Sequence, residues 1–180
     1  MDVERTRPVV VVMGVSGSGK TTVGRMLAER LGVEYAEGDE FHPAGNVAKM
    51  ASGLPLDDED RCPWLSAIAG WIAERLRSGR GGVVSCSALK YRYRDVLRQA
   101  GPGVRFLHLD VDRETTAARV ARRTGHFMPV SLVESQFEAL EPLRPDEQGG
   151  VVDAGSPPEE TVENAVALLG GLLERSFSGT

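Results

Sequence analysis

One octapeptide near the start of the chain limits its possible folds more than any other feature. Residues 14–21 read Gly-Val-Ser-Gly-Ser-Gly-Lys-Thr and match the pattern G-x-x-x-x-G-K-[ST] at every fixed position. An apolar run, 9–13, precedes the pattern, and a segment with apolar residues at helical spacing, 21–31, follows it. A strand, a glycine-rich loop and a helix in this order predict an α/β fold with an anion site at the loop.

The same loop predicts binding of a nucleoside triphosphate. Glycines let backbone N–H groups converge on a phosphate, and the following helix adds the positive end of its dipole. We expect Lys20 to act at the β- and γ-phosphates as a catalytic residue, and the Thr21 hydroxyl to be a ligand of Mg²⁺. The predicted nucleotide-binding residues of the loop are Gly14, Ser16, Gly17, Ser18, Gly19, Lys20, Thr21 and Thr22.

Composition excludes several other classes of protein. The 180 residues fit one domain, 1–180, and 21 Lys plus Arg against 26 Asp plus Glu give a net charge of −5. No overall positive field is therefore expected to attract nucleic acid or a membrane. Two cysteines without a Cys/His cluster at zinc spacing predict neither a disulfide scaffold nor a structural metal. The opening apolar stretch is too short for a signal or a membrane span, so we expect a cytoplasmic protein.

Apolar β-branched runs alternate with longer amphipathic stretches, which favours a parallel sheet with helices on both faces. Strands are expected at 9–13, 33–36, 83–86, 104–109 and 150–153, and helices at 21–31, near 46–51, and at 60–77, 90–100, 113–123 and 157–174. Residues 39–60, with two prolines and four consecutive acids, predict an insertion over a substrate pocket. The alternative for this segment is a solvated surface loop.

Two acids follow the second expected strand, at the edge of the sheet where open α/β folds bind ligands. Glu37 and Asp39 are separated by one glycine, so one can serve Mg²⁺ while the other orients an attacking hydroxyl. We assign Glu37 to the metal and Asp39 to the hydroxyl as a catalytic residue. Asp110, at the end of another expected strand, is a rival for the metal, and ordinary turn acids are the alternative.

Two basic residues lie where they could meet an anionic substrate. Arg61 begins the helix that follows the insertion, and a guanidinium suits a carboxylate. An equally simple interpretation pairs it with one of the acids at 57–60. Lys90, which follows the expected strand 83–86, is predicted to contact phosphate or substrate, against the alternative of a solvated helix charge.

Three further arginines precede a glycine-containing loop. Arg119, Arg122 and Arg123 are spaced i, i+3 and i+4, which places them on one face of a helix. We expect this face and the following residues, 119–130, to form a lid over the triphosphate, with all three arginines binding nucleotide and Arg123 acting in catalysis. A solvated face is the alternative.

The remaining chain narrows the class of nucleotide-binding protein. The N-K-x-D motif that switch GTPases use to read the base is absent from the sequence, and motors and transporters usually need a longer chain. Small-molecule kinases therefore fit best. A nucleotide-dependent binding or regulatory protein that does not catalyse transfer is the alternative from another class.

Motifs along residues 8–142 resemble, in order, those of the small P-loop gluconokinases. They are residues 13–20, Gly38-Asp39, Phe41-His42-Pro43, Asn46, residues 49–53, Pro55-Leu56, residues 58–61, Pro63-Trp64-Leu65, residues 86–90, Tyr93-Arg94-Asp95, Gly125-His126-Phe127 and residues 135–138. Shikimate and adenylylsulfate kinases share the loop and the lid but are expected to lack the pattern over residues 42–65. One departure is Glu37, where members often have Asp.

The resemblance implies a fold, a reaction and a set of site residues. The fold is the three-layer P-loop kinase fold, with a five-stranded parallel sheet flanked by helices and a mobile lid, commonly as a homodimer. The reaction is ATP- and Mg²⁺-dependent phosphorylation of D-gluconate on its 6-hydroxyl, which feeds the pentose phosphate or Entner–Doudoroff route. The implied substrate-binding residues are Asp39, His42, Lys49, Arg61, Lys90 and His126.

Overall fold

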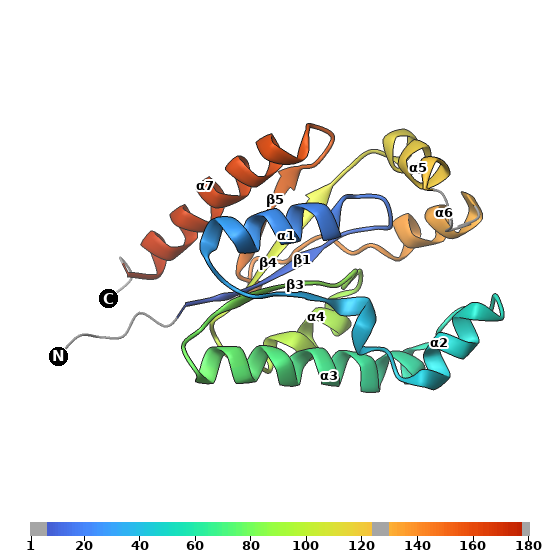
Figure 1. Ribbon diagram of the computed structural model, residues 1–180, viewed down its shortest axis with the longest axis horizontal. Helices are drawn as coiled ribbons and strands as arrows, with labels where there is room; N and C mark the ends of the chain where they lie inside the picture. The colour runs from blue at the N-terminus through green and yellow to red at the C-terminus, as the bar shows by residue number, and fades with distance from the viewer. Residues whose placement is uncertain (1–6, 124–129, 178–180) are drawn as a thin grey trace.

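Five parallel strands form the centre of the protein, and helices cover both faces of the sheet (Figure 1). The computed structural model describes residues 7–123 and 130–177. The strand order is β2-β3-β1-β4-β5. The strands are β1 Val9–Met13, β2 Tyr35–Glu37, β3 Gly82–Ser85, β4 Val104–Asp110 and β5 Gly149–Asp153. The predicted five-stranded parallel sheet is confirmed.

The helices form two covering layers and a group beyond the carboxyl ends of the strands. They are α1 Lys20–Leu31, the 3-10 helix η1 Gly38–Phe41, α2 Ala44–Ala51, α3 Asp58–Arg77, α4 Tyr91–Arg98, α5 Arg113–Arg122, α6 Val130–Ala139 and α7 Pro158–Phe177. Figure 1 shows α1 and α7 on one face of the sheet, α3 and α4 on the other, and α2, α5 and α6 at one end. Among the residues described, no helix is both long enough and apolar enough to cross a membrane.

Alternating side chains of β1 divide the core into two parts. Val9, Val11 and Met13 belong to the cluster with the apolar residues of α3 and α4. Val10 and Val12 belong to the cluster with those of α1 and α7. Because a strand buried on both faces presents successive residues to opposite sides, each helical layer has its own core. The central strand that leads into the glycine loop is thus held from both sides.

Three elements differ from the sequence-based expectation: the second strand, η1 and α6. The second strand begins at Tyr35 instead of residue 33, because Gly32 ends α1 with φ +65° and the N–H of Val33 donates to Ala28 O at 3.0 Å. Val33 therefore completes the cap of the preceding helix. Helix α6 was not predicted, and it follows the residues that lie outside the description.

The register of the sheet brings three polar chain segments to one edge. Glu37 at the end of β2 is opposite Ser85 at the end of β3, and Ser85 is opposite Val12 in β1. The connection after β1 leads to β2 on one side, while the connection after β3 leads to β4 on the other. Ligands of open α/β sheets bind where the strand order reverses in this way. The glycine loop that follows β1 lies at this point.

Candidate active site

The loop between β1 and α1 requires glycine at three positions. Gly14, Gly17 and Gly19 have φ values of +147°, +80° and +94°, which side-chain-bearing residues rarely adopt. A Cβ at Gly14 would also lie 3.0 Å from Leu109 O, and one at Gly17 would lie 3.1 Å from Thr116 O. These three glycines therefore allow the tight curl of the loop between β1 and α1.

Lys20 carries a charge that the folded protein does not stabilise well. Burial is the main reason that the pKa of its ammonium falls from 10.5 to about 8; the Asp39 carboxylate acts against this change and the Arg123 charge acts with it. The ammonium donates a hydrogen bond to Val15 O at 2.9 Å. Within the described residues, the buried Ser18 hydroxyl has no hydrogen-bond partner. A desolvated cation and an unsatisfied hydroxyl in one loop fit a polyanionic ligand.

Glu37 is held by a network of hydroxyl groups. Thr21 Oγ1 and the Tyr35 hydroxyl donate to its Oε2 at 2.8 and 2.7 Å, and Ser85 Oγ donates to Oε1 at 2.8 Å. Burial alone would raise the pKa of this carboxyl, but the hydrogen bonds together hold the pKa below its usual value. Glu37 is therefore an anion in contact with Thr21. Asp110 instead lies exposed at the other side of the sheet, beside Asp153 of β5.

Helix η1 fixes Asp39 beside the loop. A Cβ on Gly38 would lie 2.0 Å from Ser85 O, so only glycine allows this close approach of η1 to β3. Trp64 Nε1 donates to Gly38 O at 2.7 Å and anchors η1 on α3 as well. The charge of Asp39 raises the pKa of Lys20 and also that of His42. Asp39 thus acts on groups on both of its sides.

His42 links Asp39 to the more distant part of the site. Its ring stacks on Trp64 with centroids 4.2 Å apart and an interplanar angle of 14°. Burial lowers the pKa of His42, the Asp39 carboxylate raises it, and the Arg61 guanidinium lowers it. Asn46 Nδ2 lies 3.2 Å from His42 Nδ1 and donates to Asp60 O at 2.8 Å. Because an amide nitrogen can only donate, Nδ1 accepts this bond and Nε2 carries the proton.

Three cations surround one aromatic ring, and we call Arg61, Lys90, Arg92 and Tyr93 the cation cluster. The Cζ atoms of Arg61 and Arg92 lie 5.4 and 5.5 Å from the centroid of Tyr93, and Lys90 Nζ lies 5.9 Å from it. Asp58 accepts a hydrogen bond from the Tyr93 hydroxyl at 2.6 Å and pairs with Arg92 at 2.6 Å. Glu141 also acts on Arg92, so three cations face two carboxylates and the cluster keeps a net positive charge.

The acids at 57–60 do not pair with Arg61, so that interpretation was wrong. Arg61 Nη1 instead donates to Leu56 O at 2.6 Å and lies 3.4 Å from the Tyr93 hydroxyl. Asp57 and Asp60 form a capping box at the start of α3. Asp60 also accepts a hydrogen bond from Lys49 Nζ at 2.5 Å, so the Lys49 ammonium is engaged within the insertion.

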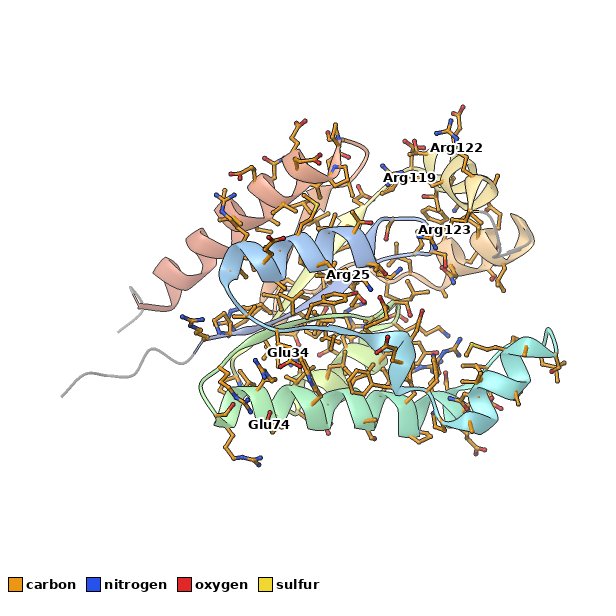
Figure 2. All side chains as sticks on the ribbon, in the orientation of Figure 1. Arg25, Glu34, Glu74, Arg119, Arg122 and Arg123 are labelled. Carbon is orange, nitrogen blue, oxygen red and sulfur yellow. The ribbon has the colours of Figure 1, made fainter. Side chains whose placement is uncertain are left out.

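The three arginines of the expected lid occupy different positions. Arg119 bridges Gly17 O at 3.4 Å and Ala154 O at 2.8 Å, and so connects the loop to the end of β5. Helix α5 ends at Arg122, and Arg123 has extended backbone angles (φ −71°, ψ 109°), so the prediction that it shares the helix face is wrong. Figure 2 shows Arg119 and Arg123 on the side of α5 nearer the loop and Arg122 farther out. Arg122 is exposed. Residues 124–129 of the expected lid, which include His126, lie outside the described residues.

Three residues contact the loop or Glu37 but were not predicted to do so from the sequence. Tyr35 is two residues before Glu37 in a strand, so strand periodicity could have placed both on one side. Ser85 ends the strand that pairs with β1, so its place at the carboxyl end of a strand could also have pointed to the site. Gln136 Oε1 accepts a hydrogen bond from Ser16 N at 2.6 Å, but its helix was not predicted.

The chain matches known proteins over most of its length. The AAA domain family model matches residues 9–143. The thermosensitive gluconokinase of Escherichia coli (strain K12) is 51% identical over 138 residues, which cover 77% of this chain and 74% of that protein. The gluconokinase of Gluconobacter oxydans (strain 621H) is 46% identical over 157 residues, which cover 87% of this chain and 88% of that protein.

A crystal structure extends the match to the fold. The gluconokinase from Sinorhizobium meliloti 1021 superposes with a TM-score of 0.88 at 46% identity, covering 98% of this chain and 99% of that chain. The phosphate-binding loop, the acids after β2 and the insertion all fall within the matched lengths. By sequence and by fold, the chain belongs to the gluconokinase family.

Proposed function

We propose that this protein transfers the γ-phosphoryl group of ATP to the 6-hydroxyl of D-gluconate, giving 6-phospho-D-gluconate and ADP. The observation that carries the proposal is a pair of sites: the Thr21–Glu37 contact of 2.8 Å beside the desolvated Lys20, and the three cations around the Tyr93 ring. Asp39 and His42 connect the two. Lys20 interacts with Asp39, Asp39 with His42, and His42 with Arg61. A site of this kind has a place for phosphate at one end and for a carboxylate at the other. Similarity to the gluconokinases selects the substrate.

The loop and its neighbours would bind the nucleotide. The backbone N–H groups of residues 14–21 that no protein acceptor engages would contact the phosphates, and Lys20 would neutralise their charge. Arg119 of α5 and Arg123, just beyond its end, would approach the loop. The Thr21 hydroxyl and the Glu37 carboxylate, 2.8 Å apart, are the oxygen donors that Mg²⁺ prefers. When bound, Mg²⁺ neutralises charge on the β- and γ-phosphates. The longer side chain of Glu37, compared with Asp, still reaches Thr21.

Asp39 would act on the attacking hydroxyl. In the transfer, the 6-hydroxyl oxygen forms a bond to the γ-phosphorus while the bond from that phosphorus to the β,γ-bridging oxygen breaks, and ADP leaves. The hydroxyl proton passes to the Asp39 carboxylate, whose charge acts on both Lys20 and His42. Positioning by the loop and by Asp39 accounts for most of the catalysis expected of a phosphoryl-transfer site.

The cation cluster would bind the carboxylate of the sugar acid. D-Gluconate carries its carboxylate and its 6-hydroxyl at opposite ends of the carbon chain, so a site for it must hold an anion well away from the reacting atoms. Arg61 and Lys90 provide that charge, and His42 lies between the two ends with an Nε2–H free to donate to a sugar hydroxyl. The roles of Lys49 and His126 in substrate binding stay predictions.

The proposal also includes the setting of the reaction. Cys62 and Cys86 are free thiols, which suits a reducing compartment, and we place the reaction in the cytoplasm. The product would enter carbohydrate-acid catabolism by the pentose phosphate or Entner–Doudoroff route. The homodimer that the family resemblance implies is checked by light scattering of the purified protein.

The decisive measurement is ADP release with MgATP and D-gluconate, with shikimate, or with no acceptor. We expect release that depends on gluconate. Faster release with shikimate would contradict the substrate assignment. Equal release in all three reactions, or none, would indicate an ATPase or a binding protein.

A further inference from the structure

A glutamine from α6 contacts the phosphate-binding loop. The Ser16 N–H donates to Gln136 Oε1 at 2.6 Å, although the two residues are 120 positions apart in sequence. Gln136 is partly buried, so its side chain reaches inward from its helix. The orientation of the amide follows from chemistry, because a backbone N–H can bond only to the oxygen of the amide group.

Helix α6 is fixed at several points, which sets the position of Gln136. Arg113 of α5 forms an ion pair with Glu134, and its guanidinium lies 5.1 Å from the ring centroid of Phe137. Beyond the helix, Glu141 N donates to Leu89 O at 2.7 Å, in the segment that precedes Lys90. The helix is thus held by α5 on one side and, through Glu141, by the segment next to Lys90 of the cation cluster on the other.

The nitrogen of the same amide is left as a donor beside the loop. With Oε1 on the Ser16 N–H, Nε2 presents two N–H bonds to its surroundings. In the part of the chain that the structure describes, no acceptor engages this nitrogen. Other N–H groups of residues 14–21 converge on phosphate in loops of this pattern. The Nε2–H bonds of Gln136 would add further donors to the N–H groups of the loop.

We propose that Gln136 is a catalytic residue that donates a hydrogen bond from Nε2 to the terminal phosphoryl group of the bound nucleotide. The inference rests on the proposed phosphoryl transfer, and it assigns a direct contact to a residue outside the loop. Its Oε1 bond to Ser16 holds the amide in place before the nucleotide binds. A donor positioned in advance stabilises the negative charge on the transferring group without reorganisation during the reaction.

Two substitutions of Gln136 separate donation from anchoring. Gln136→Glu keeps an oxygen for the Ser16 N–H but replaces the donor with an anionic oxygen, whereas Gln136→Ala removes both. Ser135→Glu adds the same charge at the neighbouring exposed position and is the matched control. Calorimetry measures the affinity for the imido analogue of ATP and for ADP, each with Mg²⁺, and an ADP-release assay measures kcat. Thermal unfolding checks that each variant is folded.

We expect Gln136→Glu to lower kcat about 100-fold and the affinity for the ATP analogue about tenfold, with ADP affinity within about twofold of wild type. Gln136→Ala should show the same pattern, and Ser135→Glu should match wild type. Retained activity in Gln136→Glu with loss in Gln136→Ala would reduce Gln136 to an anchor and overturn the proposal. Two unchanged variants, or equal losses for the analogue and ADP, would also overturn it. The expected affinity pattern without gluconate-dependent ADP release would support the contact and refute the proposed function.

Discussion

The phosphate end and the acceptor end of the site are built in different ways. The phosphate end is one contiguous loop, residues 14–21, whose shape is set by glycines with positive φ and by close backbone contacts. The acceptor end combines side chains from η1, α2, α3 and the start of α4, and it is held by hydrogen bonds from side chains to other side chains and to backbone carbonyls. A backbone-built site leaves a local signature in the sequence, whereas a side-chain-built site depends on the tertiary structure.

The two ends also differ in how their charges are balanced. The Lys20 ammonium is desolvated, which is visible in its lowered pKa, and within the described residues it donates its hydrogen bond to a backbone carbonyl and not to a carboxylate. In the cation cluster, Asp58 already offsets part of the positive charge. We therefore expect single substitutions to cost more at the phosphate end, and the predictions below test this ordering.

The largest effect is expected from Lys20→Met. Loss of the charge at the β- and γ-phosphates should lower gluconate-dependent turnover about 10⁴-fold, the scale of losing a cation that stabilises phosphoryl transfer. The substitution also removes a desolvated charge, so the unfolding temperature without nucleotide should stay at or above that of wild type. ADP release and calorimetric unfolding test both parts. A drop in both quantities would mean that Lys20 supports the loop instead of the ligand.

Asp39→Asn should have the next largest effect. Removing the group that accepts the hydroxyl proton should lower kcat about 10³-fold, within the usual range for a general base. Affinity for ATP should change little, because the loop and not Asp39 binds the nucleotide. Equilibrium binding of ATP alongside the turnover assay separates the two terms. A collapse of ATP affinity would instead assign Asp39 to the metal, and unchanged turnover would remove it from the mechanism.

Tyr93→Phe tests the acceptor end alone. The hydroxyl of Tyr93 donates to Asp58 and lies 3.4 Å from Arg61, so its loss should loosen the cation cluster while keeping the ring. We expect KM for gluconate to rise about tenfold, the scale of one hydrogen bond to a charged group, with kcat and KM for ATP near wild type.

A matched control for Tyr93→Phe lies on the same helix. Tyr91→Phe removes a hydroxyl that donates to Asp146 at 2.6 Å, away from the cation cluster. If both variants change KM for gluconate equally, the effect comes from α4 as a whole. The cluster would then not be the carboxylate site.

What the sequence could predict follows the same division between the two ends. The bounds of β1 and the identity of the loop residues were predicted correctly because every fixed position is local. The strand expected at 33–36 was misplaced because Val33, although apolar, completes the cap of α1 and does not belong to the strand. In both cases a pattern within a few residues decided the outcome.

At the acceptor end, the sequence could nominate residues but not their partners. One interpretation paired Arg61 with the neighbouring acids, yet its guanidinium donates to Leu56 O. A hydrogen bond to a backbone carbonyl does not depend on the residue type of the acceptor, so the sequence cannot indicate it. The contact between Ser16 and Gln136 is out of reach for the same reason, since it joins a loop to a helix far along the chain. Tertiary structure alone brings such groups together.

The smallest predicted effect is a pH dependence confined to the phosphate end. Because the pKa of Lys20 is about 8 in the folded protein, its charged fraction falls as pH rises through that value. ATP needs the charged form, so affinity should fall about fourfold between pH 7 and pH 8.5, as the charged fraction falls from about nine-tenths to about a quarter. The pKa values of Glu37 and His42 are held below their ordinary values, which already lie under pH 7, so neither group titrates in this interval. Calorimetric titration with MgATP across this range should therefore give a slope for wild type and a flat line for Lys20→Met.

A slope that persists in the variant would place the titrating group elsewhere, and a flat wild-type profile would mean that the nucleotide is held by backbone N–H groups and arginines without help from the Lys20 charge.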